Sequence, residues 1–205
     1  MKRLASDIFK KRNAVRRWRK EMVEEEIDLV DIIGKIIEES ESGVLDLVVE
    51  HELRGITPEM IDWWWDHIDN TERYKLWHPE DHVSFIWEVP PSKHGHVGAV
   101  QVAVEKIGEP PPVKLRIRWE DPSSVPVSTT YGHVLAASVI DHDDEPLIWF
   151  VHEYEVESYG TRMRSIFRFP AKMPHFILEA MRKHNKEEMG QFSKFLPKLY
   201  KQIVD

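Results

Sequence analysis

The spacing of apolar residues divides the chain into a helical start, a β-rich middle and a helical end. Residues 1–41 carry apolar side chains in a loosely helical rhythm and finish in a polar run at residues 38–43. We expect a boundary there. The pattern predicts an N-terminal helical extension over residues 1–43 and one folded domain over residues 44–205.

The folded domain is predicted to start with a strand and short helices. Residues 44–53 are rich in Val and Leu and are typical of a strand. Thr57 and Pro58 then supply an N-cap and a first-turn proline for a helix over residues 58–68. A second short helix is predicted to begin at Pro79, which would place His82 in its first turns.

The rest of the domain reads as a run of strands followed by one long helix. The strands are predicted at residues 97–107, 113–119, 133–140, 147–157 and 161–169. The helix covers about residues 174–204, and Pro197 should kink or interrupt it. This order is typical of an α+β helix-grip fold, in which a curved antiparallel sheet surrounds the last helix and encloses a cavity.

Composition supports a globular domain and restricts its chemistry. Eight tryptophans and a hydrophobic fraction of 41% are sufficient for a sizeable core. No apolar run approaches the roughly 20 residues that span a bilayer, and no secretory signal is visible, so we expect a cytoplasmic protein without a membrane partner. Because the chain has no cysteine, any metal site must use His, Asp and Glu.

The charge is distributed unevenly along the chain. Residues 1–20 hold nine Lys or Arg against the single acid Asp7, so the net charge of -8 divides into about +8 there and about -16 elsewhere. We interpret this segment as a packed or oligomer-forming helix, which allows a homodimer. A targeting or binding arm is the alternative, but the acidic remainder opposes nucleic acid as a partner.

The C-terminal segment contains the spacing His-x-x-x-Glu twice, at His175 with Glu179 and at His184 with Glu188. Each pair would share one helix face, and the two pairs would face opposite sides. On a helical wheel centred on the apolar stripe at Phe192, Glu188 and His184 lie at about 40° and 80°, and the first pair at about 100° and 140°. The second pair should therefore face inward, where a carboxylate needs a neutralising partner such as a metal. A half-exposed pair without a ligand role is the alternative.

Several blocks of sequence resemble the diacetylphloroglucinol hydrolase family over about residues 44–205. They lie at residues 55–65, 73–82, 159–165, 184–189 and 195–197. The likeness is most specific in the Trp-His-Pro-x-Asp-His block that ends at His82 and in the block that begins at His184. The resemblance implies a Bet v 1-like helix-grip fold and zinc-dependent hydrolysis of a carbon–carbon bond between an acyl group and a phenolic ring. A small acylphenol would then be the substrate.

The resemblance also implies residue roles. It assigns metal ligands to His82, His184 and Glu188 and a substrate-binding role to Tyr74. His78 is the nearer rival of His82, since residues four apart share a helix face, but we interpret it as a partner of a ligand or as an exposed residue.

The fourth ligand in the resembled family is a glutamate on an early strand. Glu105 is our prediction because it shares a strand face with Gln101 and Ala103, while Glu109 beside a triple proline is the alternative. Two His and two Glu would neutralise one Zn²⁺ per chain, although Fe²⁺ and Mn²⁺ accept the same donors. The family pattern has an amide three residues after the ligand histidine, where this chain has Phe85, which argues against diacetylphloroglucinol itself as the substrate.

The strand at residues 147–157 supplies two more candidate site residues. His152 and Tyr154 share one face, and with Tyr74 we predict them as catalytic residues that donate hydrogen bonds to phenolic or carbonyl oxygens. Ordinary hydrogen-bonded core residues are the alternative. For the whole chain, the alternative function is a helix-grip carrier that binds a hydrophobic or aromatic molecule without chemistry. That reading leaves the inward His184 and Glu188 unexplained.

Overall fold

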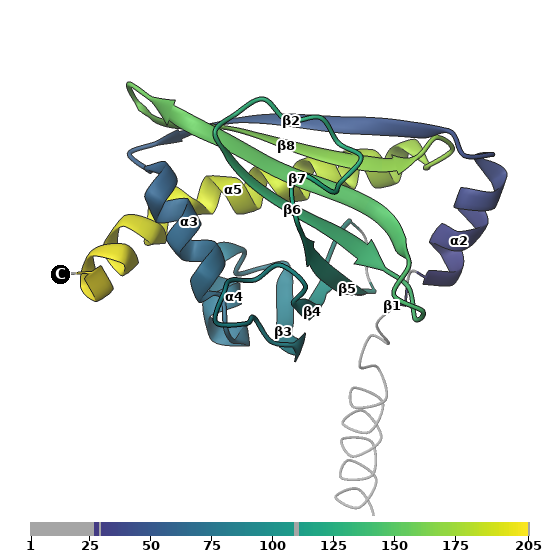
Figure 1. Ribbon diagram of the computed structural model, residues 1–205, viewed down its shortest axis with the longest axis horizontal. Helices are drawn as coiled ribbons and strands as arrows, with labels where there is room; N and C mark the ends of the chain where they lie inside the picture. Colours follow the sequence, from purple (N-terminus) through teal and green to yellow (C-terminus); the bar gives the residue numbers. More distant parts are fainter. Residues whose placement is uncertain (1–26, 29, 109–110, 205) are drawn as a thin grey trace, which may run out of the picture.

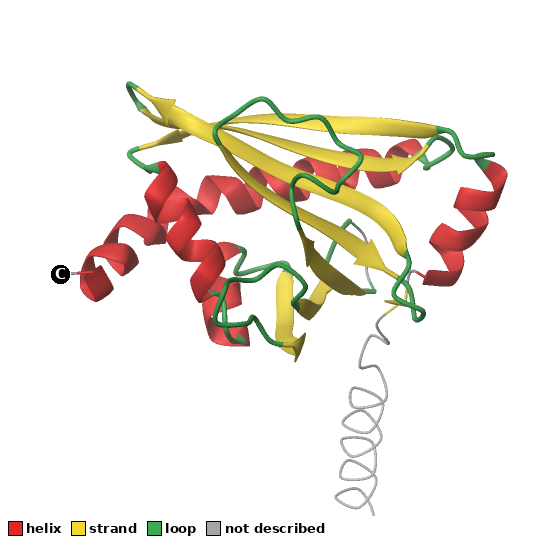
Figure 2. Cartoon of the chain, viewed as in Figure 1, coloured by secondary structure: helices red, strands yellow, loops and turns green. Residues whose placement is uncertain are grey.

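One curved antiparallel sheet forms the centre of the protein (Figures 1 and 2). The computed structural model describes residues 27–28, 30–108 and 111–204. In this part of the chain the sheet has the order β2-β8-β7-β6-β5-β4-β3, and the short strand β1 (Ile27–Asp28) pairs in parallel with β5. The sheet strands are β2 (Val44–Arg54), β3 (His82–Val89), β4 (Val100–Glu105), β5 (Val113–Glu120), β6 (His133–Ile140), β7 (Pro146–Glu157) and β8 (Gly160–Pro170).

The described helices lie on one side and at the ends of this sheet. The long helix α5 (His175–Val204) runs along the sheet, and α2 (Val30–Glu39) stands at the end of the sheet near the start of α5 (Figure 1). The short helices α3 (Pro58–His67) and α4 (Thr71–Trp77) lie towards the other end of α5. This arrangement confirms the predicted helix-grip fold. Among the described helices, none is long and apolar enough to cross a membrane.

Alternating side chains explain why the sheet closes over α5. Along β5 every second residue is buried, from Val113 to Trp119, while the residues between them are partly exposed. Buried side chains of α5, including Met189, Phe192 and Leu196, complete the same core. Burial of apolar area on both elements therefore holds the helix against the sheet.

The structure corrects the predicted region between residues 68 and 89. The second short helix does not begin at Pro79; it is α4, which begins at Thr71 because Asn70 accepts a hydrogen bond from the backbone N–H of Arg73 at 2.8 Å. The chain then turns at Pro79, and His82 is the first residue of β3 rather than part of a helix. This strand is absent from the sequence prediction.

The helical predictions for the two ends of the chain agree with the structure only in part. Residues 30–39 are helical as expected, but Ile27–Asp28 forms a strand, whose backbone pairs with Val113 and Lys114. The basic residues 1–20 lie outside the described residues. At the other end, Pro197 lies inside α5 without interrupting it, and Figure 1 shows the helix changing direction in its C-terminal turns.

Candidate metal centre

Four of the predicted site residues meet at one end of the sheet. His82 begins β3 and pairs with Glu105, the last residue of β4, while His184 and Glu188 come from α5. All four are buried. The rival pair on the same helix faces outward, because the side chains of His175 and Glu179 are 85% and 54% exposed. The predicted inward orientation of the second pair is confirmed, whereas Glu109 lies outside the described residues.

The distances between these side chains suit ligands of one ion. His184 Nε2 lies 3.4 Å from Glu105 Oε2 and 3.8 Å from Glu188 Oε2, and His82 Nε2 lies 3.6 Å from Glu188 Oε2. Two ligands at about 2.1 Å from a tetrahedral zinc are themselves about 3.4 Å apart. Ligand atoms of His82, His184 and Glu188 all lie within 4.8 Å of one another, and Glu105 joins them through His184.

The two histidines each leave a buried nitrogen without a hydrogen bond. Nε2 of His82 and Nε2 of His184 are among the buried side-chain atoms that lack a partner in the described part of the chain. His82 Nδ1 lies 3.0 Å from the carbonyl oxygen of Tyr74 and must donate to it, which leaves Nε2 as the nitrogen that can bind a metal. Two buried imidazole nitrogens beside two carboxylates are a donor set that fits a divalent metal.

The two carboxylates are held in the same way, by one oxygen each. Glu105 Oε1 accepts a short hydrogen bond from the hydroxyl of Tyr74, and Glu188 Oε1 accepts one from Asn185 Nδ2 at 2.8 Å. The second oxygen of each carboxylate, Oε2, faces the histidines. Tyr74, predicted from the resemblance to bind substrate, thus contacts a candidate ligand, and its ring also stacks on His82 at 3.9 Å.

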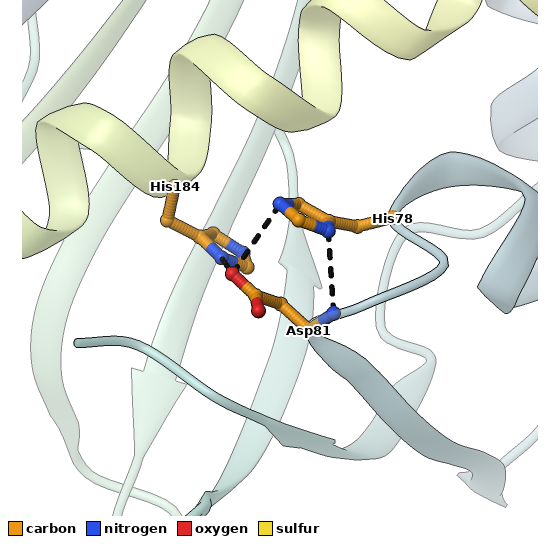
Figure 3. A group of neighbouring side chains, drawn as sticks. All are labelled: His78, Asp81 and His184. Atoms are coloured by element: carbon orange, nitrogen blue, oxygen red, sulfur yellow. Dashed lines mark hydrogen bonds and ion pairs between the residues drawn. The ribbon is translucent and has the colours of Figure 1, made fainter. Parts of the chain in front are cut away.

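Asp81 orients His184 from the opposite side (Figure 3). His184 Nδ1 donates to Asp81 Oδ2 at 3.2 Å, and His78 Nε2 lies 3.3 Å from the same oxygen. His78 Nδ1 accepts the N–H of Asp81 at 3.3 Å, and its ring stacks on that of His184 at 4.9 Å. The structure therefore places His78 beside a candidate ligand and His82 directly against Glu188. His78, Asp81 and His184 also form a second group that is close enough to hold a metal.

The charges of the cluster shift several pKa values strongly. Burial alone would raise the pKa of Glu105, but the close contact with His184 and the proximity of His82 lower it to about 2. Burial would lower the pKa of His184, but its hydrogen bond to Asp81 and the nearby carboxylates of Glu105 and Glu188 raise it to about 10. Without a cation, a proton on His184 balances part of the negative charge that a divalent metal would otherwise neutralise.

A cavity of about 280 Å³ adjoins the cluster, between the sheet, α2 and α5. Its polar end is formed by Tyr74, Gln101, Glu105, His152, His184 and Glu188. The rest of the wall is apolar, and three isoleucines of α2, Ile32, Ile33 and Ile36, belong to it. A cavity with one polar end and apolar walls suits a small aromatic molecule.

The two predicted donors of β7 have different positions. His152 lines the cavity, stacks on Trp65 at 5.7 Å and hydrogen-bonds Ser165 at 2.8 Å through Nδ1. Burial lowers the pKa of His152 to about 4, so its ring is neutral at pH 7. The hydroxyl of Tyr154 instead donates to Asp62 at 2.5 Å, and Tyr154 is not part of the cavity wall. The structure therefore gives the hydroxyl of Tyr154 a partner outside the cavity wall, and its catalytic role stays a prediction.

Phe85 also lies away from the cavity wall. It is buried against Tyr74, with ring centroids 5.2 Å apart, and packs on Trp87. The ring of Phe85 therefore packs against the ring of Tyr74 and restricts its position.

Sequence reasoning missed four polar residues that surround the site. Asp81 and Asn185 stand inside the two quoted motifs, next to His82 and His184, and their side chains orient candidate ligands. His51 and Ser165 face inward from β2 and β8, where their neighbours on the same strand face are mainly apolar. A polar residue on an otherwise apolar strand face is the sequence signal that could have indicated His51 and Ser165.

The fold and the cluster together define a helix-grip protein with a candidate metal centre at the polar end of its cavity. Solved structures share the fold: Ara h 8.0201, a Bet v 1-like protein, has a TM-score of 0.53 at 10% identity and covers 76% of this chain and 99% of its own. Protein NE0264 from Nitrosomonas europaea has a TM-score of 0.51 at 17% identity, with 76% of this chain and 96% of its own covered.

The chain belongs to the family described as the DAPG hydrolase PhiG domain, whose model matches residues 37–173. A curated relative is the phloretin hydrolase of Eubacterium ramulus, which is 24% identical over 183 residues. That match covers 74% of this chain, and the chain spans 65% of the length of the relative. The match to the family model ends before α5.

Proposed function

We propose that the protein is a metal-dependent hydrolase that cleaves the carbon–carbon bond between an acyl group and a phenolic ring. Membership of the DAPG hydrolase family and similarity to a phloretin hydrolase support this reaction class. The observation that carries the metal dependence is the pair of unpartnered, buried Nε2 atoms of His82 and His184 beside two buried carboxylates. They stand at the polar end of a cavity that suits a small aromatic molecule.

Buried nitrogens without hydrogen bonds favour a metal-binding protein over a carrier protein that binds no metal. A buried polar atom without a hydrogen bond destabilises a protein by about 1–3 kcal/mol. Nε2 of His82 and Nε2 of His184 face carboxylate oxygens at 3.6 Å and 3.4 Å without a hydrogen bond, and an ion between these atoms would satisfy them. Total stabilities of domains are only about 5–15 kcal/mol. A carrier has no need of this arrangement, because apolar residues at the same positions would fill the cavity end at no such cost.

His82, Glu105, His184 and Glu188 would hold the ion, with Zn²⁺ as our expectation and Fe²⁺ or Mn²⁺ as metals that accept the same donors. When bound, such a metal supplies a polarised water for hydrolysis and stabilises negative charge on a substrate oxygen. The contributions of the chain itself are orientation and exclusion of solvent. Asp81, Tyr74 and Asn185 hold three of the ligands in place, and the apolar wall keeps bulk water from the substrate.

The substrate follows from the two ends of the cavity. Its oxygens would lie among Tyr74, His152 and the metal-binding cluster, and its ring and acyl arm along the apolar wall. In the reaction, the bond from the acyl carbon to the ring carbon breaks, the acyl carbon gains the OH of water, and the ring carbon gains a proton. A phenolic hydroxyl on the ring makes this departure feasible, because the ring carbon is protonated through its keto tautomer.

The test is a hydrolysis assay on acylphenols. Zinc-loaded protein is incubated with C-acylphloroglucinols of different acyl length and with their O-acyl isomers, and the released carboxylic acid and phenol are measured. We expect release from the C-acyl compounds, loss of activity in His82→Ala, and normal activity in the control His175→Ala, which changes an exposed histidine. No release from the whole C-acyl panel by metal-loaded protein would refute the proposal. Tight binding of the same compounds without turnover would favour the carrier.

A further inference from the structure

A chain of polar side chains connects the metal-binding cluster with His152. It runs from Glu188 through Asn185 on α5, His51 on β2 and Ser165 on β8 to His152 on β7. The last two are direct partners in the register of β7 and β8, so their side chains stand side by side on the inner face of the sheet. None of the three connecting residues lines the cavity.

The first half of this chain has a fixed direction. Glu188 Oε1 is a carboxylate oxygen and can only accept, so the atom of Asn185 that faces it at 2.8 Å must be the amide nitrogen. The other amide atom, Oδ1, is then an acceptor and faces His51 Nε2 at 2.9 Å. His51 Nε2 must therefore carry a proton and donate it.

The second half follows from the single proton of a hydroxyl. Ser165 Oγ lies 3.3 Å from His51 Nε2, which already carries a proton, and 2.8 Å from His152 Nδ1. The hydroxyl proton has an acceptor only if it points to His152 Nδ1. His152 Nδ1 is then a lone pair, and the proton of its neutral ring must reside on Nε2.

We propose that Asn185, His51 and Ser165 are positioning residues that keep His152 in the Nε2–H tautomer, so that His152 presents an N–H donor to the cavity. Within the described part of the chain, the hydrogen bond of His152 is made by Nδ1 and Nε2 has no hydrogen-bond partner, and the ring borders the cavity. The parallel ring of Trp65 holds the imidazole plane, with an angle of 8° between the two rings. The lowered pKa of His152 agrees with a neutral ring.

The consequence for catalysis rests on the proposed function. A neutral imidazole with its proton on Nε2 cannot remove a proton from water through that nitrogen; it can only donate. His152 would therefore stabilise the oxygen of the substrate on which negative charge develops, rather than act as a general base. The same Glu188 that orients Asn185 would be a metal ligand, so the metal-binding cluster and the donor are built on one polar network.

The tautomer can be measured by long-range ¹H–¹⁵N correlation NMR on the full-length protein with labelled histidine. Spectra are recorded near pH 7 on chelator-treated protein and again after zinc addition, and His152 is assigned by the loss of its signals in His152→Asn. We expect a protonated Nε2 and an unprotonated Nδ1 in both samples. A proton on Nδ1, or a doubly protonated ring, would overturn the proposal without any measurement of activity.

Ser165→Ala tests the relay, with two matched controls. The variant should shift the Nδ1 signal of His152 and lower kcat by about tenfold or more, since a preorganised donor loses its support. Ser165→Thr keeps the hydroxyl and should retain both the signal and kcat. Ser138→Ala removes an equally buried serine hydroxyl, which donates to Glu120 elsewhere in the sheet, and should change neither.

The outcomes separate this proposal from the proposed function. Unchanged Nδ1 signals and unchanged kcat in Ser165→Ala would refute the relay even if the protein is a hydrolase. Conversely, if the wild-type tautomer and the response to Ser165→Ala are as expected but no acylphenol is hydrolysed, the tautomer assignment stands and the proposed reaction fails.

Discussion

Removal of the inward pair, by His184→Ala together with Glu188→Ala, should abolish the stabilisation of the protein by zinc. Removal of the outward pair, by His175→Ala together with Glu179→Ala, should leave that stabilisation intact. Both double variants delete the same side chains, at the same spacing, from the same helix. They differ in burial: the inward residues are 2% and 5% exposed, and the outward side chains are 85% and 54% exposed.

The expected magnitude follows from where the four candidate ligands lie. They join β3, β4 and α5, so an unfolded chain cannot present them together, and zinc should bind the folded state alone. At a free zinc concentration about 1,000 times Kd, such binding stabilises the protein by about 4 kcal/mol. For a domain of roughly this size, about 1 kcal/mol raises Tm by about 2–4 °C, so zinc should raise Tm by about 8–16 °C.

The assay is thermal unfolding with and without zinc, followed by elemental analysis of the dialysed protein. The comparison uses the zinc-induced change in Tm rather than Tm itself, because the deletion of a buried carboxylate and imidazole also alters the metal-free protein. Wild type and the outward variant should retain about one zinc per chain and the full shift, and the inward variant neither. Equal shifts in all three proteins would mean that the metal does not bind at the inward pair, and the reasoning from burial and distance would be wrong.

Four further outcomes follow from the same geometry. Tyr74→Phe removes the hydroxyl that holds Glu105 and should weaken zinc binding by about 10–100-fold in a competition titration with a chelator; unaltered affinity would contradict an orienting role. Asp81→Asn removes the charge behind His184 and should weaken it by a similar factor, which the same titration measures. Ile33→Ala widens the cavity beside α2, so kcat/KM should shift towards longer acyl groups across the substrate panel, at a loss of about 2–4 kcal/mol in urea unfolding. In metal-free protein, the pKa of His184 is about 10 in the folded state against 6.5 in the unfolded state, so this residue stabilises the fold fully below pH 6.5 and less as the pH rises towards 10. The pKa of Glu105 is about 2 in the folded state against 4.5 in the unfolded state, so this residue stabilises the fold fully above pH 4.5 and less as the pH falls towards 2. The free energy of unfolding should therefore peak between about pH 4.5 and 6.5, and a maximum above pH 8 would contradict this assignment.

The predictable parts of the fold were those with a local signal. Thr57 and Pro58 mark the start of α3 through an N-cap and a proline, and the strands β5 to β8 show alternation or β-branched runs between clear turn residues. The segment around Pro79 carried a misleading local signal, because proline followed by two acids is also typical of a helix start. The real helix start is Asn70, and β3 is stabilised by pairing with β4, which no local pattern contains.

For the site, helical periodicity was sufficient where one element decides the outcome. It placed His184 and Glu188 inward and their rivals outward, because both pairs stand on one regular helix. The meeting of His82 with Glu105 depends on the register of two strands, and the resemblance to a family, rather than a pattern, pointed to it. Tyr154 shares its strand face with His152 as predicted, but its hydroxyl reaches Asp62 of α3, a tertiary contact that alternation cannot show.

The supporting contacts distinguish a metal site from an accidental cluster of acids and histidines. Each candidate ligand uses one polar atom in a hydrogen bond to a neighbour. His82 bonds to the carbonyl of Tyr74, His184 to Asp81, Glu105 to the hydroxyl of Tyr74 and Glu188 to Asn185. These contacts restrict the side chains before any ion arrives, so an ion that binds has less conformational entropy to remove. It follows that loss of a ligand should remove binding, whereas loss of a support should only weaken it. An accidental cluster has no such order, because its members do not depend on supports to converge on one point.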